Sequence, residues 1–274
     1  MGYAERMEDS EILAAHLQYM HDSKYAASTI RERMRILATL PHLVDVDRLA
    51  VQAWQHERQT KPKGEPRAAT SLSGEASHAR DFWRWCRTQG LIDHNPADWL
   101  HKVRTTKTKA VAVTEGELYQ LMHAAPEDVR RMIALTGLAG LRSSEAAAIT
   151  WEDIDYGNET LWVRSGKGGK DRPVPLSGGL LASLGDPGAG PIVGRQVTAK
   201  AFSAALGRYM RKRGVNLTAH KLRARYITRF IAATGDAVAA AEVAGHSGLG
   251  SIMRYAVASS DTMRRGAEAA GRIG

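Results

Sequence analysis

A tyrosine near the C-terminal end is the side chain from which we infer a chemistry. Tyr255 lies nine residues after His246, in a short segment that also contains Arg254. A phenol has an ordinary pKa of about 10, so it attacks phosphorus near neutral pH only in an electropositive site with a proton acceptor nearby. The preceding chain supplies candidate cations and acceptors. These are Arg142, Lys167, His220, Arg223 and His246.

These side chains suit attack on a phosphodiester. Guanidinium groups stay charged and bind two phosphate oxygens in a planar fork, a role that fits Arg142 and Arg223. His220 and Arg223 are three residues apart, so on a helix they share one face and reach the same phosphate. A leaving alkoxide needs a proton, which a lysine among cations can donate. Lys167 and Lys170 both lie in one glycine-rich turn, and both are candidates for this donor.

Taken together, the motifs resemble those of the tyrosine recombinase (phage integrase) family, which cuts and rejoins DNA through a phosphotyrosine. The resemblance rests on the order Arg142, Lys167, His220-Lys221-Leu222-Arg223, Gly245-His246 and Tyr255. The spacings are 25 residues from Arg142 to Lys167, 23 from Arg223 to His246 and nine from His246 to Tyr255, similar to compact members. The resemblance covers about residues 110–260 and is only architectural over 1–104.

The resemblance implies a role for each residue of the set. Tyr255 would be the nucleophile, and Lys167, in preference to Lys170, the general acid toward the 5′ oxygen. His220 would take part in proton transfer with the nucleophile, and His246 would contact the phosphate or Tyr255. Glu145 would orient the helix after Arg142 without itself being a catalyst.

No cofactor or metal is expected. Strand transfer through a phosphotyrosine conserves the bond energy, so neither ATP nor a divalent ion need take part. The ten histidines include no His-Glu-x-x-His pattern. The Gly-Lys turn at Lys167 also lacks the phosphate-binding pattern Gly-x-x-x-x-Gly-Lys-Ser/Thr, which excludes a nucleotide-binding P-loop there.

Length and composition indicate a globular protein of two domains. The chain has 274 residues, 43% of them hydrophobic and 24% charged. No apolar run approaches the roughly 18 residues that a membrane span needs, and the N-terminus shows no signal-peptide pattern. We therefore expect a cytoplasmic protein without a membrane partner. Cys86 is the single cysteine, which excludes an internal disulfide, and its aromatic neighbours predict a buried thiol.

The net charge of +9 is concentrated in the last quarter of the chain. Residues 1–199 contain 25 basic and 25 acidic residues, whereas residues 200–274 contain 13 basic and four acidic ones. Such a basic region favours a polyanionic partner such as DNA. A solvated basic helical surface is the alternative interpretation.

Residues 1–104 predict a helical domain of four helices, which we expect to bind the core DNA site. The helices begin near Ser10 and Ser28 and span about 47–59 and 69–88, with Ser28 as the expected cap of the second. Residues 105–112 are predicted to link the domains. Basic residues in and beside this linker are expected to contact the DNA backbone, as are two further residues. The full set is Lys102, Arg104, Lys107, Lys109, Lys170 and Arg225.

Residues 113–274 predict a catalytic domain with a C-terminal tail, mostly helical with a small antiparallel sheet. Thr114 and Glu117 form a capping-box pattern before helices at about 115–124 and 127–137, and another helix starts at Ser143. Strand-like segments at 160–164 and 172–176 predict a hairpin with Lys167 at its tip. Further helices are expected at about 198–213, 218–234, 236–244 and 248–256. The predicted fold class is thus mainly α, a four-helix core-binding domain followed by an α+β catalytic domain.

We predict a site-specific DNA recombinase that acts through a 3′-phosphotyrosine and a Holliday junction. Four protomers would assemble on double-stranded DNA core sites to integrate or excise a phage or mobile element, with a directionality factor as a further candidate partner. One four-helix domain accounts for residues 1–104, so a compact, Xer-like form without an arm-binding domain is expected. The alternatives are an Xer-like chromosome or plasmid dimer resolvase, a type IB topoisomerase and a non-catalytic DNA-binding regulator.

Overall fold

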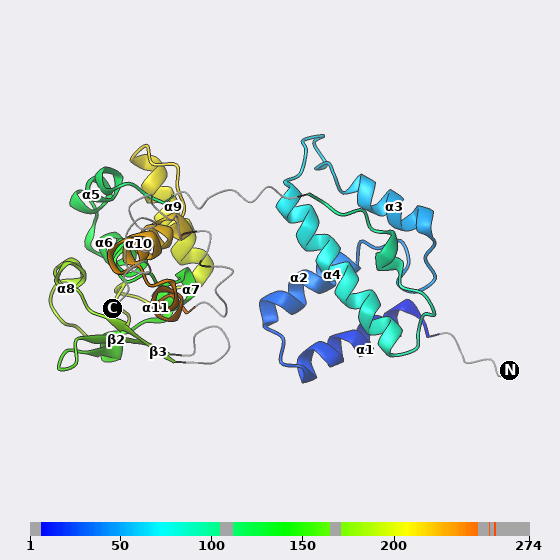
Figure 1. Cartoon of the computed structure of the whole chain (residues 1–274), viewed down its shortest axis with the longest axis horizontal. Coiled ribbons are helices and arrows are strands. Elements are labelled where there is room, and N and C mark those ends of the chain that lie inside the picture. The colour runs from blue at the N-terminus through cyan, green and yellow to red at the C-terminus, as the bar shows by residue number, and fades with distance from the viewer. Residues whose placement is uncertain (1–6, 105–111, 165–170, 246–251, 253–254, 256–274) are drawn as a thin grey trace, which may run out of the picture. The chain divides into compact units, whose positions relative to one another are not determined.

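The computed structural model describes residues 7–104, 112–164, 171–245, 252 and 255. The chain divides into two units, Met1–Lys107 and Thr108–Gly274, which are coloured along the chain in Figure 1. The described residues are mostly helical and contain one small antiparallel sheet, which confirms the predicted fold class. Within these ranges no helix has both the length and the apolar character that crossing a membrane requires. The predicted linker falls almost wholly on residues 105–111, outside the described ranges.

The first unit is a bundle of helices around its own core. The elements are α1 (Asp9–Asp22), α2 (Ala27–Leu37), α3 (Arg48–Glu57), α4 (Ala69–Thr88) and a 3-10 turn η1 (Pro96–Trp99). Ile12, Ile36, Val51, Phe82 and Trp83 are buried together at its centre. Cys86 is buried there too, as predicted, and burial raises the pKa of its thiol to about 12. The expected cap at Ser28 was wrong, because α2 begins one residue earlier and follows Ala26.

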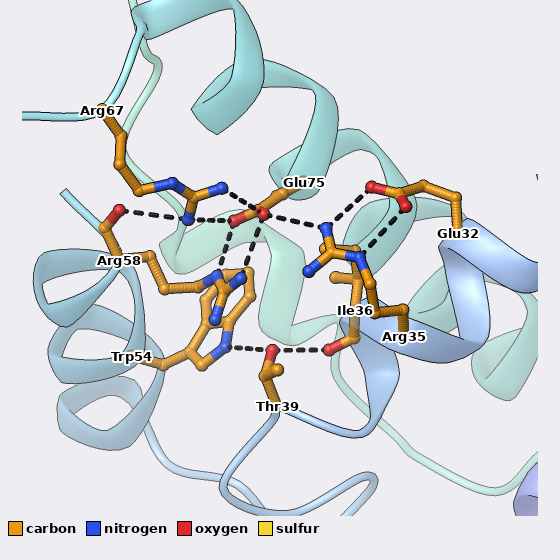
Figure 2. A network of polar contacts seen from close by, with 8 residues as sticks. All are labelled: Glu32, Arg35, Ile36, Thr39, Trp54, Arg58, Arg67 and Glu75. Atoms are coloured by element: carbon orange, nitrogen blue, oxygen red, sulfur yellow. Dashed lines mark hydrogen bonds and ion pairs between the residues drawn. The ribbon is translucent and has the colours of Figure 1, made fainter. Parts of the chain in front are cut away.

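A buried carboxylate ties three helices of this unit to a small hairpin (Figure 2). Residues 59–67 fold back on themselves through a bridge between Thr60 and Pro66. Glu75 of α4 then accepts hydrogen bonds from Arg58 after α3, from Arg67 at the end of the hairpin and from Arg35 of α2. Although burial works to raise it, the bonds from Arg58 and Arg67 lower the pKa of Glu75 to about 2. This ionised carboxylate holds together segments that are far apart in sequence.

The second unit has more elements and a larger core. Its helices are α5 (Glu115–His123), α6 (Glu127–Gly137), α7 (Ser143–Ala148), a 3-10 turn η2 (Trp151–Asp153), α8 (Gly178–Leu184), α9 (Ala199–Lys212), α10 (Ala219–Thr234) and α11 (Ala237–Val243). The capping box predicted at Thr114 is present, since Thr114 and Glu117 exchange backbone-to-side-chain hydrogen bonds. α10 packs against α6, and Leu222 of α10 is fully buried in the core.

The sheet contains three short antiparallel strands in the order β1-β2-β3. β2 (Thr160–Val163) pairs with β3 (Arg172–Pro175), which confirms the predicted hairpin, while its tip at 165–170 lies outside the described residues. β1 (Ile154–Asp155) is a further strand, which the sequence analysis did not predict. Leu161 and Val174 face each other and are buried. Arg172 occupies the same inward-facing side of β3 as Val174, an unusual position for a charged residue.

Candidate active site

Tyr255 lies beside His220 in the second unit. Its phenolic Oη is 3.3 Å from Nε2 of His220, within hydrogen-bond distance. The tyrosine is 3% exposed and packs in a cluster with Ala224 of α10, Ala244 and Ile252. Because His220 stands in the first turn of α10, this helix fixes the imidazole next to the phenol. A proton acceptor is therefore placed where an attacking tyrosine would need one.

Arg223 follows His220 by less than one helical turn and is almost fully buried. Its guanidinium donates to the carbonyl of Gly140 and to that of Ala244. Burial first, and then the charge of Arg142, lower the pKa of Arg223 to about 10, so the group remains cationic at neutral pH.

Three arginines bind three consecutive carbonyls at the end of α11. Nε of Arg172 donates to Val243 O at 2.9 Å, Arg223 donates to Ala244 O, and Arg142 donates to Gly245 O. The last carbonyls of a helix have no partner within the helix and carry the negative end of its dipole. This concentration of cations therefore gathers around the turn that leads from α11 toward Tyr255.

Glu145 of α7 binds two of these arginines from within the site. It accepts from Nη1 and the backbone N of Arg142 at 2.7 and 2.8 Å, and from Nη1 and Nη2 of Arg172 at 3.0 and 2.8 Å. Burial raises its pKa, but the bonds from Arg172 and Arg142 outweigh burial and lower the pKa to about 2. Glu145 thus stays ionised and orients Arg142, whose side chain is 25% exposed.

The turn before Arg142 depends on a glycine. Gly140 has φ of +68°, and a Cβ there would lie 2.3 Å from the ring of Tyr226 on α10. Only glycine permits this close approach of the turn to α10 without strain. The turn delivers Arg142 to the start of α7, directly before Ser143.

Comparison with known proteins places the chain in a family. The model of the phage integrase family matches residues 112–187. The tyrosine recombinase XerA of Thermococcus kodakarensis is 30% identical over 200 residues, which cover 67% of this chain and 70% of XerA. The chain belongs to the phage integrase family of tyrosine recombinases. XerC of Chromobacterium violaceum matches more of the length, with 26% identity over 82% of this chain and 87% of XerC.

Solved structures of the family share the fold. A lambda integrase dimer bound to a COC′ core site has a TM-score of 0.72 at 18% identity, covering 91% of this chain and 95% of that chain. The Tn1549 transposon integrase in complex with transposon right end DNA has a TM-score of 0.74 at 18% identity, covering 96% and 99%. At this level of identity the likeness establishes the architecture.

The structure brings part of the predicted site together. Arg142, Glu145, His220, Arg223 and Tyr255 gather around the end of α11 and the start of α10. Two predicted catalytic residues, Lys167 and His246, lie outside the described residues. Their roles, like those of the residues that the structure does bring together, remain predictions.

The predicted DNA contacts have diverse surroundings. Lys102 and Arg104 are exposed at the end of the first unit, whereas Lys107, Lys109 and Lys170 lie outside the described residues. Arg225 is engaged by Glu115 through two bonds of 2.8 and 2.6 Å and also donates to Gly137 O. A DNA contact by Arg225 would have to compete with Glu115.

Sequence reasoning missed Arg172. Its signal was present, because a charged residue that alternates with Val174 on a strand points inward and then needs a buried partner of opposite charge. Glu145, already singled out for its place after Arg142, is that partner. Over the described ranges, no group of three or more histidine, cysteine or acidic residues is arranged to hold a metal ion.

Proposed function

We propose that this chain is a site-specific DNA recombinase that cleaves and rejoins duplex DNA through Tyr255. The observation that carries the proposal is the 3.3 Å approach of the Tyr255 phenol to His220, next to the cationic side chains of Arg142 and Arg223. Membership of the phage integrase family supports it, since the relatives carry the names XerA and XerC recombinase.

In the cleavage step, the Tyr255 oxygen attacks the phosphorus of the scissile phosphodiester. A bond forms between this oxygen and phosphorus, the bond from phosphorus to the 5′ oxygen breaks, and His220 accepts the phenolic proton. Lys167, in the role that the family resemblance implies, donates a proton to the leaving 5′ oxygen. Arg142 and Arg223 stabilise the charge that develops on the non-bridging oxygens.

Rejoining is the same reaction in reverse with a new partner. The free 5′ hydroxyl of a second duplex attacks the 3′-phosphotyrosine and releases Tyr255. Two such exchanges through a Holliday junction require four active sites, so we propose a tetramer on two DNA sites. A structural neighbour of the same fold is a lambda integrase tetramer bound to a Holliday junction, with a TM-score of 0.73.

Two biological roles fit this chemistry. Integration or excision of a phage or mobile element, assisted by a directionality factor, is the first. Resolution of chromosome or plasmid dimers is the second, favoured by the XerC and XerA relatives, which this chain spans over 55% to 87% of their length. Either role would place the protein in the cytoplasm with the DNA.

The proposal is tested with nicked suicide duplexes, which trap the covalent intermediate because the released fragment diffuses away. A library of such duplexes from the source genome is incubated with the wild-type protein, Tyr255→Phe and Tyr119→Phe, and adducts are resolved on denaturing gels. We expect adducts from the wild type and from Tyr119→Phe, whose tyrosine is exposed on α5. Tyr255→Phe should form none. Retarded DNA on native gels without any adduct from the wild type would instead indicate a non-catalytic DNA-binding protein.

A further inference from the structure

We infer that Arg172 is a positioning residue for strand cleavage: it fixes Glu145 and the end of α11, and through them Arg142 and the turn toward Tyr255. The inference rests on the proposed function, in which Arg142 and Tyr255 act on the scissile phosphate. Arg172 comes from the start of β3, two residues after the end of the 165–170 segment that contains Lys167. One side chain thus connects three parts of the site that are remote in sequence.

Each of the three guanidinium nitrogens of Arg172 donates a hydrogen bond. Nη1 and Nη2 form a fork on the Glu145 carboxylate, and Nε donates to Val243 O. The residue is only 7% exposed. With every nitrogen engaged and almost no exposed surface, Arg172 acts on the reaction through its partners without touching the substrate.

Arg142 is more exposed than Arg172, so the two arginines can have different roles. Both bind Glu145 and a carbonyl at the end of α11, but the side chain of Arg142 is 25% exposed and that of Arg172 is 8% exposed. A phosphate oxygen that arrives with DNA can replace the Gly245 carbonyl as the partner of Arg142. The bond from Arg172 to Val243 O remains in place during that exchange and keeps the end of α11 anchored.

The fit between Arg172 and Gly245 supports this assignment independently. Gly245 has φ of +62°, and a Cβ there would lie 2.8 Å from Nη1 of Arg172 and 2.9 Å from Cζ. The chain therefore passes directly against the guanidinium. Glycine serves two requirements at this point, the left-handed backbone and the absence of a side chain over Arg172.

The alternative is that Arg172 only stabilises the fold. A buried ion pair contributes little net stability relative to apolar side chains of the same size, because desolvation offsets the attraction. What such an ion pair contributes to an active site is a fixed geometry of the side chains that it joins. A displacement of about 1 Å in a catalytic group can cost about a hundredfold in rate.

The test compares Arg172→Gln and Arg172→Lys with Arg164→Gln in the full chain. Arg164 follows β2 of the same hairpin and binds Asp153, but its side chain is 63% exposed, so it is a matched control. Using the suicide duplex on which the wild type reacts best, we measure DNA affinity on native gels and the rate of adduct formation at saturating protein. We expect affinities within about twofold of wild type, and a rate lower by about ten- to a hundredfold for Arg172→Gln. Arg172→Lys, which keeps the charge without the fork, should be intermediate.

A second measurement does not depend on cleavage. The amides of Ala244 and Gly245 donate to Ala240 O and Glu242 O, so their hydrogen exchange reports on the end of α11. Without DNA, we expect their exchange to be about tenfold faster in Arg172→Gln and unchanged in Arg164→Gln. If the wild type forms no adduct, the proposed function fails while this exchange still decides whether Arg172 anchors α11. Wild-type exchange in Arg172→Gln would overturn the inference, as would a rate loss that merely follows the fraction of unfolded protein.

Discussion

Gly245 is sensitive to substitution for two reasons: its backbone is left-handed, and it packs against the Arg172 guanidinium. In Gly245→Ala the new Cβ has to displace the Arg172 guanidinium in addition to straining a left-handed backbone. Gly235 also has a positive φ, of +71°, but a Cβ added there would have no atom within 4 Å, so Gly235→Ala is the matched control. We expect Gly235→Ala to lower the free energy of unfolding by about 1 kcal/mol. Gly245→Ala should lose about 1 to 3 kcal/mol more through overpacking. Equal losses in urea denaturation would contradict the packing of Arg172 on Gly245.

His16 makes the first unit sensitive to mild acid. It is fully buried, and neither ring nitrogen has a hydrogen-bond partner among the described residues. Burial, and then the charge of Arg33, lower its pKa to about 4 from 6.5. A histidine whose pKa is lower in the folded state binds protons more readily when unfolded. Stability is therefore fully present above pH 6.5 and is lost as the pH falls toward 4.

Replacing His16 should remove this sensitivity. We expect His16→Leu to raise the free energy of unfolding at pH 7 by about 1 kcal/mol, because the unpaired ring nitrogens are gone. The variant should also lose less stability than the wild type between pH 6.5 and 4. Urea denaturation across this range measures both effects, with His21→Leu, at an exposed position of the same helix, as the control. An unchanged pH profile in His16→Leu would contradict the assignment.

At the residue scale, local motifs could be predicted and long-range partners could not. Arg142 and the pair His220 and Arg223 were found because each lies in a short pattern of its own. Arg172 was missed because its hydrogen-bond partners are remote in sequence: Glu145 is 27 residues away and Val243 is 71 residues away. No periodicity within one strand reveals such partners.

Among the elements, α2, α3, α4 and the 59–67 hairpin are joined by ion pairs to one carboxylate, that of Glu75 in α4. Glu75→Gln would leave Arg58 and Arg67, whose side chains are only 19% and 20% exposed, facing a neutral amide. We expect a loss of about 2 to 4 kcal/mol in the free energy of unfolding. The control is Glu65→Gln in the exposed pair with Lys61, which should change stability by no more than about 1 kcal/mol.

The Glu75 carboxylate also makes the free energy of unfolding depend on pH, in a lower pH range than His16 does. Because the folded-state pKa of Glu75 is lowered to about 2 from 4.5, its contribution is present above pH 4.5 and is lost as the pH falls toward 2. Glu75→Gln should lack this part of the acid unfolding curve. A variant that retains the wild-type curve below pH 4.5 would show that other carboxylates dominate it.

The longer helices could be predicted from the sequence, whereas the shortest helices and strands could not. Helices with strong apolar periodicity, such as α4 and α10, were expected close to their observed bounds. α8 was not expected, because Gly178 and Gly179 at its start are poor helix formers, and the side chain of Ser177 caps it. β1 has only two residues, and pairing with β2 defines it, so no local pattern could have predicted it.

At the scale of the whole molecule, the first unit contains a hydrophobic core of its own, so residues 1–107 should fold as an isolated fragment. That core runs from Ile12 in α1 to Leu100 after η1. We expect a helical circular dichroism spectrum and cooperative thermal unfolding. A fragment of residues 1–88 lacks Ala97, Leu100 and the bonds between Gln55 and the His101 backbone, and should unfold without cooperativity. Two equally cooperative fragments would show that η1 does not complete the core.

The hydrophobic clusters of the second unit are likewise formed by residues of that unit, from Ala112 to Tyr255. For enzyme engineering, this self-sufficiency has a practical consequence. In the part of the chain that the structure describes, the cluster around Tyr255 contains only residues of the second unit, so we expect it to tolerate exchange of residues 7–104 for the helical domain of another recombinase. If the proposed roles of the two units hold, a chimaera joined within 105–111 should cleave at the DNA sites of the donor of its helical domain, and protein engineers could vary the two units in separate libraries.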